Sequence, residues 1–391
     1  MVVKTQNTWL VSVLIVFFYY LLVVHLLTGF ITQSTIFCLL VIVASTGQNY
    51  LNRNASLLIF YGLSMSIIMT IKGKYDISSV VDTILSPVCY YVFGNLVVDY
   101  YNRTRKNYLS FLLLTAFFFG AYFYLWTVRD IIETNSLVSP QRWLIIGATQ
   151  HTATHIGTNV SIGLVGLSAF AVIRGNKTLK WGFLAVGLLS LLSVIHMVNR
   201  SGIIIALLCL IVVLFFYYKD TRHFKNFILS MLSIVVISIA LYTIFLSNSD
   251  FQSVVEAYSE REMGAEDASI LEGGGRTVRW SDAISNIPSH PFGWESSSGG
   301  YTYAHNMWLD VAKDAGWIPF VLLIIISVRI ISGILKLQKI ECSSLICILL
   351  GINVCMFSSA FVEPVLGGMF FSCYCVIWGF QERYNSIRKI K

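Results

Sequence analysis

The chain has 391 residues, of which 56% are hydrophobic, 14% are aromatic and only 12% are charged, and its formal net charge is +7. Soluble domains carry roughly 25% charged residues, so this composition excludes an ordinary soluble protein and predicts an integral membrane protein. The basic residues gather in short segments between apolar runs, which is typical of membrane topology and disfavours a nucleic-acid-binding protein.

Twelve apolar segments approach the ~20 helical residues that cross a hydrocarbon core. In chain order they are 9–28, 31–47, 55–71, 79–99, 108–128, 157–173, 181–198, 202–218, 227–246, 317–335, 343–362 and 366–380. The first lacks a small-residue cleavage site and is followed by further spans, so we expect a retained helix and not a signal peptide. We therefore expect an all-α polytopic membrane protein with about twelve transmembrane helices.

The basic residues orient these spans. An even number of spans leaves both termini on one side, and most of the 27 Lys and Arg residues then lie on that same side. Because Lys and Arg in short loops remain cytoplasmic, we expect cytoplasmic N- and C-termini. The predicted organisation is a nine-helix bundle over 1–246, a large extracytoplasmic loop over 247–316, and a three-helix part with a cytoplasmic tail over 317–391.

Two histidines lie in a shorter outside segment, 129–156. Placed on a helix, His151 and His155 would share one face at i, i+4, but "HTATH" lacks the Glu of HExxH and no third ligand is evident. A polar cavity lining is favoured over a metal site, and we expect neither a metal nor a cofactor.

Two arginines on the outside are held in short, defined contexts. Arg200 lies in "HMVNRSGIII", a turn of a few residues between two spans, where it must reach lipid phosphate or enter a cavity between helices. Arg276 follows three glycines, 273–275, whose N–H groups are able to form an anion-binding nest. A guanidinium offers paired donors that match phosphate oxygens. Both arginines are candidates for binding phosphate.

The end of the large loop has helical periodicity from His305 to Ala315. Asn306, Asp310, Lys313 and Asp314 would share one face, and Met307, Trp308, Val311, Ala312 and Ala315 the other. Gly316 predicts the end of this helix, and Pro319 fits the first turn of the next. We expect a helix in the plane of the interface, with His305 as its first residue near headgroup depth. The alternative is an elbow helix that His305 merely caps.

Several motifs are missing from the sequence. It holds no P-loop, no GxGxxG after a strand, no catalytic-serine motif and no Asp-x-Asp, so nucleotide-driven chemistry is disfavoured. Charge within the spans is sparse, with Asp82 and Arg329 the clearest cases, which weakens a proton-coupled transporter. A histidine suits proton abstraction from a hydroxyl near neutral pH, and arginines suit a lipid pyrophosphate. Together they favour group transfer from a lipid pyrophosphate to a sugar hydroxyl.

Three stretches, in this order and topology, resemble the O-antigen ligase and O-antigen polymerase superfamily. They are "NRSG" at the start of a span, "GGGRTVRW" in the large outside loop and "AHNMWLDVAKDAGWIPF" before the next span. The stretches "RWLIIGATQHTATHIGTN" and "FVEPVLGGMFF" resemble it more loosely. The resemblance covers mainly 196–380. One departure is that Asn199, instead of Ser or Thr, precedes Arg200.

The resemblance implies a metal-independent glycosyltransferase of the bacterial inner membrane, with a polyprenyl (undecaprenyl) pyrophosphate-linked glycan as donor and a sugar hydroxyl as acceptor. His305 would be the general base, and Arg200 and Arg276 would bind the donor pyrophosphate on the extracytoplasmic side. A flippase and a chain-length regulator are the implied partners. Roles for Arg142, Arg279 and Glu363 stay open.

We therefore predict a polymerase of repeat units for a surface polysaccharide, an O-antigen or a capsule. The close alternative is a ligase that transfers the finished glycan to a lipid A core or a protein, because both enzymes use the same donor and the same base. The rival from another class is a flippase or transporter for a lipid-linked glycan.

Overall fold

The computed structural model of the chain describes most of its residues. The described residues are 7–28, 31–45, 50–139, 141–146, 149–220, 224–233, 236, 249–263, 276–295, 303–340, 343–362 and 369–390. They divide into two compact units. Unit 1 comprises Met1–Phe111, Val278–Leu337 and Ala360–Lys391, and unit 2 comprises Leu112–Thr277 and Gln338–Ser359.

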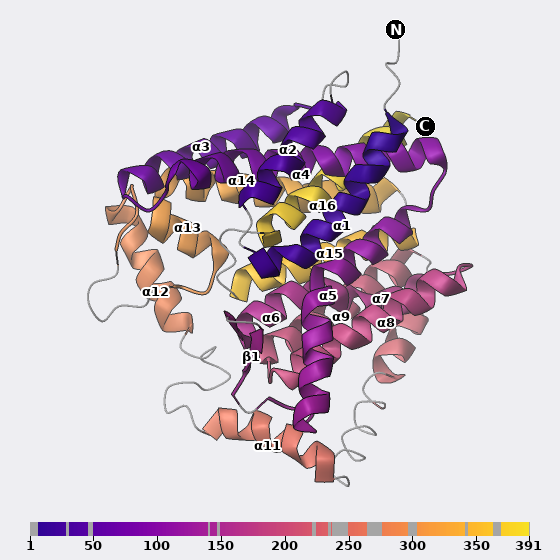
Figure 1. The fold of residues 1–391 in the computed structure, drawn as a ribbon. Coiled ribbons are helices and arrows are strands. Elements are labelled where there is room, and N and C mark those ends of the chain that lie inside the picture. Colours follow the sequence, from indigo (N-terminus) through magenta and orange to yellow (C-terminus); the bar gives the residue numbers. More distant parts are fainter. Residues whose placement is uncertain are drawn as a thin grey trace. The chain divides into compact units, whose positions relative to one another are not determined.

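Helices dominate the described residues, as predicted (Figure 1). The first group is α1 (Thr8–Thr28), α2 (Ile31–Ser45), α3 (Arg53–Ile71), α4 (Ile77–Thr104), α5 (Tyr108–Thr134), α6 (Ala153–Val160), α7 (Val165–Val172), α8 (Lys177–His196) and α9 (Arg200–Asp220). The second is α11 (Ser249–Met263), α12 (Arg276–Asn286), α13 (Met307–Ala315), α14 (Trp317–Ile340), α15 (Ser344–Val362) and α16 (Met369–Ile390). Two 3₁₀ turns complete them, η1 (Ser161–Leu164) and η3 (Ile287–Ser289).

Among the described residues, eight helical segments are long and apolar enough to cross a membrane, which makes this a multi-pass membrane protein. They are α3, α4, α5, the continuous run α6–η1–α7, α8, α9, α14 and α15. Of the other predicted spans, α1, α2 and α16 overlap three. The span predicted at 227–246 is described only in part, with residues 227–233 helical, and the remainder falls almost wholly outside the described residues.

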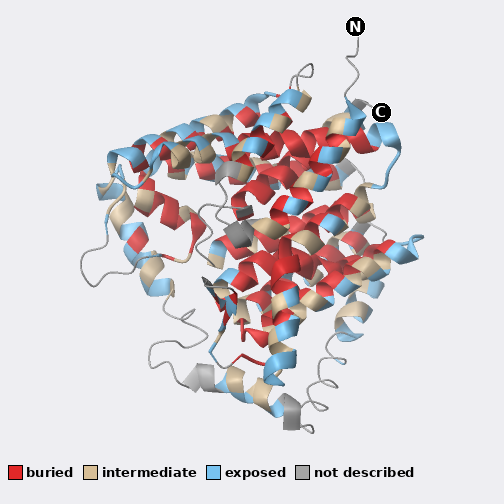
Figure 2. Ribbon diagram, viewed as in Figure 1, coloured by how far each residue is buried: buried red, intermediate tan, exposed pale blue. Residues whose placement is uncertain are grey.

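Unit 1 is built around two helices, α4 and α16, that lie side by side (Figure 1). Gly94 and Gly379 permit this approach, because a Cβ on Gly94 would stand 2.1 Å from the Val376 carbonyl oxygen, and one on Gly379 would stand 1.9 Å from that of Tyr91. Small residues let membrane helices approach closely. The fully buried Trp378 fills the same contact, and both helices are largely buried (Figure 2).

Unit 2 holds the short sheet, which the sequence analysis did not predict. Strands β1 (Trp143–Ile146) and β2 (Thr149–Thr152) form an antiparallel hairpin, with Trp143 opposite Thr152. Thr152 then caps α6, because its hydroxyl accepts the His155 N–H. The hairpin thus leads directly into a membrane-length helix and sets the position of the loop that precedes it.

Candidate functional site

His305 lies two residues before α13, next to the helix cap Asn306, and its backbone conformation is uncommon. The side chain of Asn306 caps the helix by accepting the N–H groups of Trp308 and Leu309, each at 3.2 Å. The helix therefore begins at Met307, and the prediction that His305 is its first residue was wrong. His305 has a φ of 57°, in the left-handed region that residues other than glycine seldom adopt, although Asn, Asp and His enter it more often than the rest. A residue in this region costs backbone strain, so contacts from the surrounding structure must stabilise this conformation of His305.

The carboxylate of Asp310 holds the backbone on both sides of His305. It accepts the N–H of Ala304 at 2.6 Å and the N–H of Asn306 at 3.2 Å. The side chain is almost fully buried, and burial raises the pKa of Asp310 to about 6. Near neutral pH the group is largely ionised, so it offers strong acceptors to both N–H groups. Asp310 is thus the group that fixes the turn at His305.

The segment around His305 is also held from outside α13. Trp280 of α12 donates from Nε1 to the Ala304 carbonyl oxygen at 2.9 Å, and its ring packs on Phe361 with centroids 4.9 Å apart. Asn306 donates from Nδ2 to the Phe361 carbonyl oxygen at 3.2 Å. Bonds from two other elements thus meet on the residues that flank His305.

Helix α13 is enclosed to a greater extent than its periodicity suggests. On the face predicted to be polar, Asn306, Asp310 and Lys313 are buried, and on the apolar face Met307 and Val311 are buried as well (Figure 2). The expectation of a polar face exposed at an interface was wrong. The physical reason is that the side-chain oxygens of Asn306 and Asp310 accept hydrogen bonds from backbone N–H groups in the helix cap and in the preceding turn, so these side chains do not need water.

The C-terminal end of α13 and the start of α14 agree with the sequence prediction. Gly316 has a φ of 76° and ends α13, and its N–H bonds to the Ala312 carbonyl oxygen. A Cβ on Gly316 would stand 2.0 Å from the Pro291 carbonyl oxygen, so only glycine fits this turn. Pro319 lies in the first turn of α14, as predicted.

Arg200 begins α9 after a tight turn in unit 2, as its position in the sequence predicts. Asn199 secures this turn, because its Oδ1 accepts the Gly202 N–H at 3.0 Å and its Nδ2 donates to the Ala153 carbonyl oxygen at 2.8 Å. Asn199 therefore caps α9, a role that the Ser or Thr of the family pattern also suits. Arg200 is half-buried and donates from Nη2 to the Tyr258 carbonyl oxygen at 2.8 Å.

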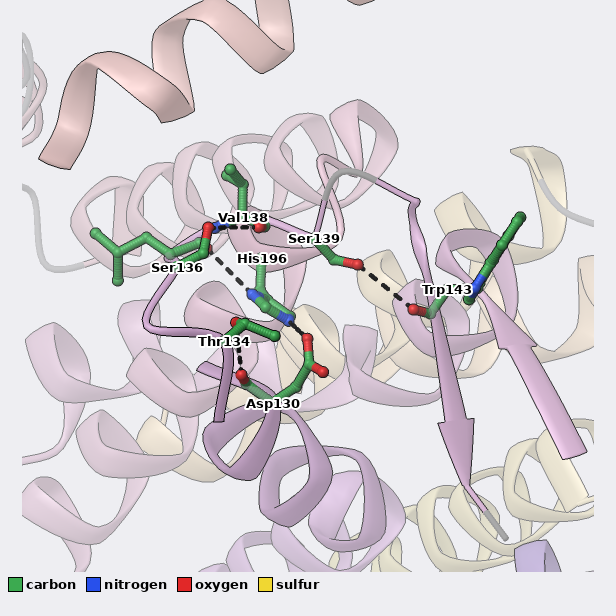
Figure 3. Close-up of polar contacts among 8 residues, drawn as sticks. Asp130, Thr134, Ser136, Val138, Ser139, Trp143 and His196 are labelled. Carbon is green, nitrogen blue, oxygen red and sulfur yellow. Dashed lines mark hydrogen bonds and ion pairs between the residues drawn. The ribbon is translucent and has the colours of Figure 1, made fainter. Parts of the chain in front are cut away.

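A buried histidine anchors the other side of this turn (Figure 3). The Nε2 of His196 lies 2.8 Å from a carboxylate oxygen of Asp130, and its Nδ1 lies 3.2 Å from the Leu137 carbonyl oxygen. Both partners are acceptors, so the ring makes both bonds as donor only when it carries two protons. The Ser139 N–H donates to the His196 carbonyl oxygen at 2.7 Å. The end of α5 and the following loop thus fix the turn before Arg200.

Arg276 is the first residue of α12 and belongs to the same unit as Arg200. Its Nη1 donates to the Ser201 hydroxyl at 3.3 Å, so unit 2 brings Arg276 to the start of α9, next to Arg200 in sequence. The glycine nest expected at 273–275 lies outside the described residues. His305 belongs to unit 1, where its cap and clamp form a separate arrangement.

His151 and His155 do not share a helix, contrary to the sequence analysis. His151 is on β2 and His155 is on α6, with their Nδ1 atoms 3.2 Å apart. Burial lowers the pKa of His151. In the part of the chain that the structure describes, no three His, Cys, Asp or Glu side chains group together in a way that suits a metal ion. The ring of Phe123 contacts both histidines.

Three further residues had been left open. Arg142, with a φ of 58°, lies at the base of the hairpin, where its carbonyl oxygen accepts the Ala153 N–H at 2.9 Å. Arg279 is half-buried on α12. Glu363 lies outside the described residues.

These contacts define what each arrangement is able to do. Unit 2 presents arginine donors at the start of a membrane-length helix, which suits an anionic group at the membrane surface. Unit 1 holds an imidazole beside a buried carboxylate, which suits proton transfer. The roles of Asp310, Trp280 and the His196–Asp130 pair were not predicted from the sequence. Of these residues, only Asp310 was indicated by a sequence pattern, since an acidic residue follows His-Asn in the family pattern.

Residues 185–324 match the family model described as O-Antigen ligase (Wzy_C), which confirms the resemblance. The matched segment contains Arg200, Arg276 and His305. Family members are membrane glycosyltransferases of the ligase and polymerase type. A search of curated proteins gives no significant match.

Proposed function

We propose, on the premise of the O-antigen ligase match over residues 185–324, that this chain is a metal-independent membrane glycosyltransferase that polymerises polyprenyl-pyrophosphate-linked repeat units into a surface polysaccharide. It works in the bacterial inner membrane, with cytoplasmic termini, about twelve spans and an extracytoplasmic active site. The matched segment contains the two arginines that unit 2 gathers at the start of α9 and the histidine whose backbone Asp310 holds. That combination carries the proposal.

The proposed reaction uses His305 as general base. The imidazole removes the proton from an acceptor hydroxyl as its oxygen attacks the anomeric carbon of the donor sugar. The bond from that carbon to the pyrophosphate oxygen breaks, and the lipid pyrophosphate leaves with the electron pair. Direct displacement inverts the anomeric centre. Arg200 and Arg276 stabilise the charge that develops on the leaving group, the electrostatic role that preorganised donors serve best.

Two features of the residues support these roles. The Asp310 carboxylate accepts the N–H groups on both sides of His305 and so holds the backbone that carries the proposed base. Arg200 donates to a carbonyl oxygen and Arg276 donates to a hydroxyl oxygen, and a guanidinium bonds more strongly to an anionic pyrophosphate than to either neutral acceptor.

The second candidate is a ligase that moves the glycan to a lipid A core or a protein, and the description of the family model, O-Antigen ligase, favours it. One assay separates the two. Purified protein is incubated with a lipid-pyrophosphate-linked repeat unit, without nucleotide or divalent metal, and the glycans are resolved on a gel. A ladder spaced by one repeat supports the polymerase, and transfer only to an added lipid A core or protein supports the ligase. If folded protein with the cognate substrate forms neither product, the result contradicts the proposed glycosyltransferase function.

A further inference from the structure

A cavity of about 280 Å³ lies within unit 1, and its walls come from α3, the first part of α4, the start of α16 and the segment on either side of His305. Small-molecule sites occupy roughly 300–1,000 Å³. The cavity is at the lower limit of this range, so it suits a group the size of one monosaccharide and excludes a whole repeat unit.

The lining of this cavity combines aromatic rings with hydrogen-bond acceptors. Its rings are those of Tyr61, Tyr75, Tyr303 and Phe371. Rings of this kind pack against the C–H faces of a sugar, and the phenol hydroxyls add donors and acceptors at the ring edges. Among the described residues that line the cavity there is no Arg, Lys or His. The Lys74 ammonium is paired with the Asp314 carboxylate, so the described lining offers a phosphate or pyrophosphate no cation of its own.

The two charged residues of the lining are both carboxylates, Asp82 and Asp314. Asp82 lies on the sixth residue of α4, a membrane-length helix, and accepts a hydrogen bond from the Ser86 hydroxyl. An ionisable group in such a helix is costly and marks a functional site by default. The proposed reaction gives Asp82 no role, because the base and the pyrophosphate-binding residues are elsewhere. Carboxylates accept strong hydrogen bonds from sugar hydroxyls and repel anions.

The cavity is next to His305 in the chain. Tyr303 and Met307, two residues before and two residues after His305, both line it. The α3–α4 turn is joined to α13, because Lys72 donates from Nζ to the Asp314 carbonyl oxygen at 2.9 Å, and the Lys74 ammonium lies 3.7 Å from the Asp314 carboxylate. These contacts hold together two of the elements that supply residues to the cavity lining.

We propose that this cavity binds the terminal neutral sugar of the acceptor and presents its hydroxyl to His305. The proposal rests on the proposed glycosyltransferase function. Asp82 selects a hydroxylated, uncharged ring by accepting its hydroxyl protons, and Tyr303 covers one face of that ring. The same chemistry serves the acceptor of a polymerase and that of a ligase that acts on a lipid A core, since both of these acceptors end in a sugar.

Binding is tested without the reaction. Wild-type protein, Asp82→Asn, Tyr303→Ala and the control Glu133→Gln are placed in lipid nanodiscs, so that no sugar-headed detergent competes. Glu133 is an exposed partner in a surface ion pair with Arg129. Saturation-transfer NMR then measures binding of a panel of neutral methyl glycosides and the matching sugar phosphates. Tyr303 is on an exposed part of the loop, so its variant will fold even if Asp82→Asn does not.

The expected result is binding of at least one neutral glycoside to wild type and Glu133→Gln. Binding is expected to be at least about tenfold weaker in Asp82→Asn, as for a lost charged hydrogen bond, and about fivefold weaker in Tyr303→Ala. Sugar phosphates should bind more weakly than their neutral counterparts. Three results would overturn the proposal. The first is that wild type binds no glycoside, and the second is that folded Asp82→Asn or Tyr303→Ala binds as tightly as wild type. The third is that sugar phosphates bind more tightly than neutral glycosides.

The transfer assay then separates this proposal from the function on which it rests. If the cavity binds the acceptor, Asp82→Asn raises the KM for acceptor by at least about tenfold and leaves the KM for donor unchanged. If wild type transfers the glycan and has the same KM for acceptor as Asp82→Asn, the proposal that the cavity binds the acceptor is wrong, while the proposed glycosyltransferase function stands. Absence of transfer by wild type, with glycoside binding intact, would instead contradict the glycosyltransferase.

Discussion

The turn that carries His305 and the turn that carries Arg200 are both strained, but the chain holds them in different ways. His305 and Val198 have left-handed φ values of 57° and 51°. The His305 turn is clamped by residues within six positions, through Asn306 and Asp310. The Arg200 turn depends on partners 46 to 66 residues away in sequence. One turn is built mainly by local sequence, and the other by the packing of α5, the hairpin and α8.

The two turns also differ in the charges that they hold. The His305 turn contains a buried carboxylate whose oxygens are fully engaged by backbone N–H groups. Arg200 has a single neutral acceptor, a carbonyl oxygen, among its described hydrogen bonds. A rigid turn suits a base that must meet one hydroxyl, and an adjustable cation suits a lipid pyrophosphate that must enter and leave. The following substitutions test this contrast.

The largest expected effect is that of His305→Ala. Loss of a general base lowers kcat by about 10² to 10⁴-fold. The rate of transfer from a lipid-pyrophosphate donor, measured at saturating acceptor, checks this. His290→Ala is the matched control, because His290 is in the same loop and packs against Trp294 with ring centroids 5.6 Å apart. Equal rates in His305→Ala and wild type would remove His305 from the reaction.

Arg200→Ala and Arg276→Ala come next. Each removes a donor to the leaving group, and we expect kcat to fall about 10² to 10³-fold. Lysine at either position should restore the charge but not the paired donors, so activity should recover only in part. Arg129→Ala, which breaks an exposed ion pair, should leave the rate unchanged. Full activity in either alanine variant would exclude that arginine from pyrophosphate binding.

Asp310→Asn should lower kcat by roughly tenfold to a hundredfold, because a neutral amide accepts more weakly from the two N–H groups that fix the His305 turn. The KM for donor should stay constant, which separates loss of positioning from loss of binding. An unchanged kcat in the folded variant would show that the turn at His305 does not need the carboxylate.

The same residue gives a pH dependence of stability. The pKa of Asp310 is raised to about 6 in the folded protein, above its usual value of 3.8, so the folded state binds the proton more tightly. Its contribution to stability is therefore full below about pH 4, is lost as the pH rises to about 6, and is on the order of 2–3 kcal/mol. The difference in Tm between wild type and Asp310→Asn should fall over this window and stay flat above pH 7. A flat difference throughout would contradict the raised pKa.

The smallest effect is expected for Asp130→Asn. It weakens the bond to the buried His196, and we expect about 2 kcal/mol of lost stability and a rise of a few fold in the KM for donor. The cycle with His196→Asn checks that the two residues act together, because the double variant should lose less than the sum of the single losses. Additive losses, or an unchanged donor KM, would mean that this pair does not position Arg200.

Composition and local spacing were enough to predict the membrane helices, two helix boundaries and the family resemblance. Apolar runs of membrane length fix the helices, since a backbone in lipid must satisfy its own hydrogen bonds. Gly316 and Pro319 mark a helix end and a helix start because of their backbone geometry. The motifs around Arg200, Arg276 and His305 indicated the resemblance to the O-antigen ligase family, and the family model matches residues 185–324.

Tertiary structure decided the rest, because the contacts join residues far apart in the chain. Periodicity placed Asp310 on a polar face, but only the contacts of Trp280 and Phe361 with the residues that flank His305 enclose that face. No local pattern pairs His196 with Asp130, 66 residues away, or makes a β-hairpin from a segment that reads as a helix. A polar group in an apolar protein takes whichever partner the packed helices bring within reach, since leaving it unpaired costs more than the local preference it overrides.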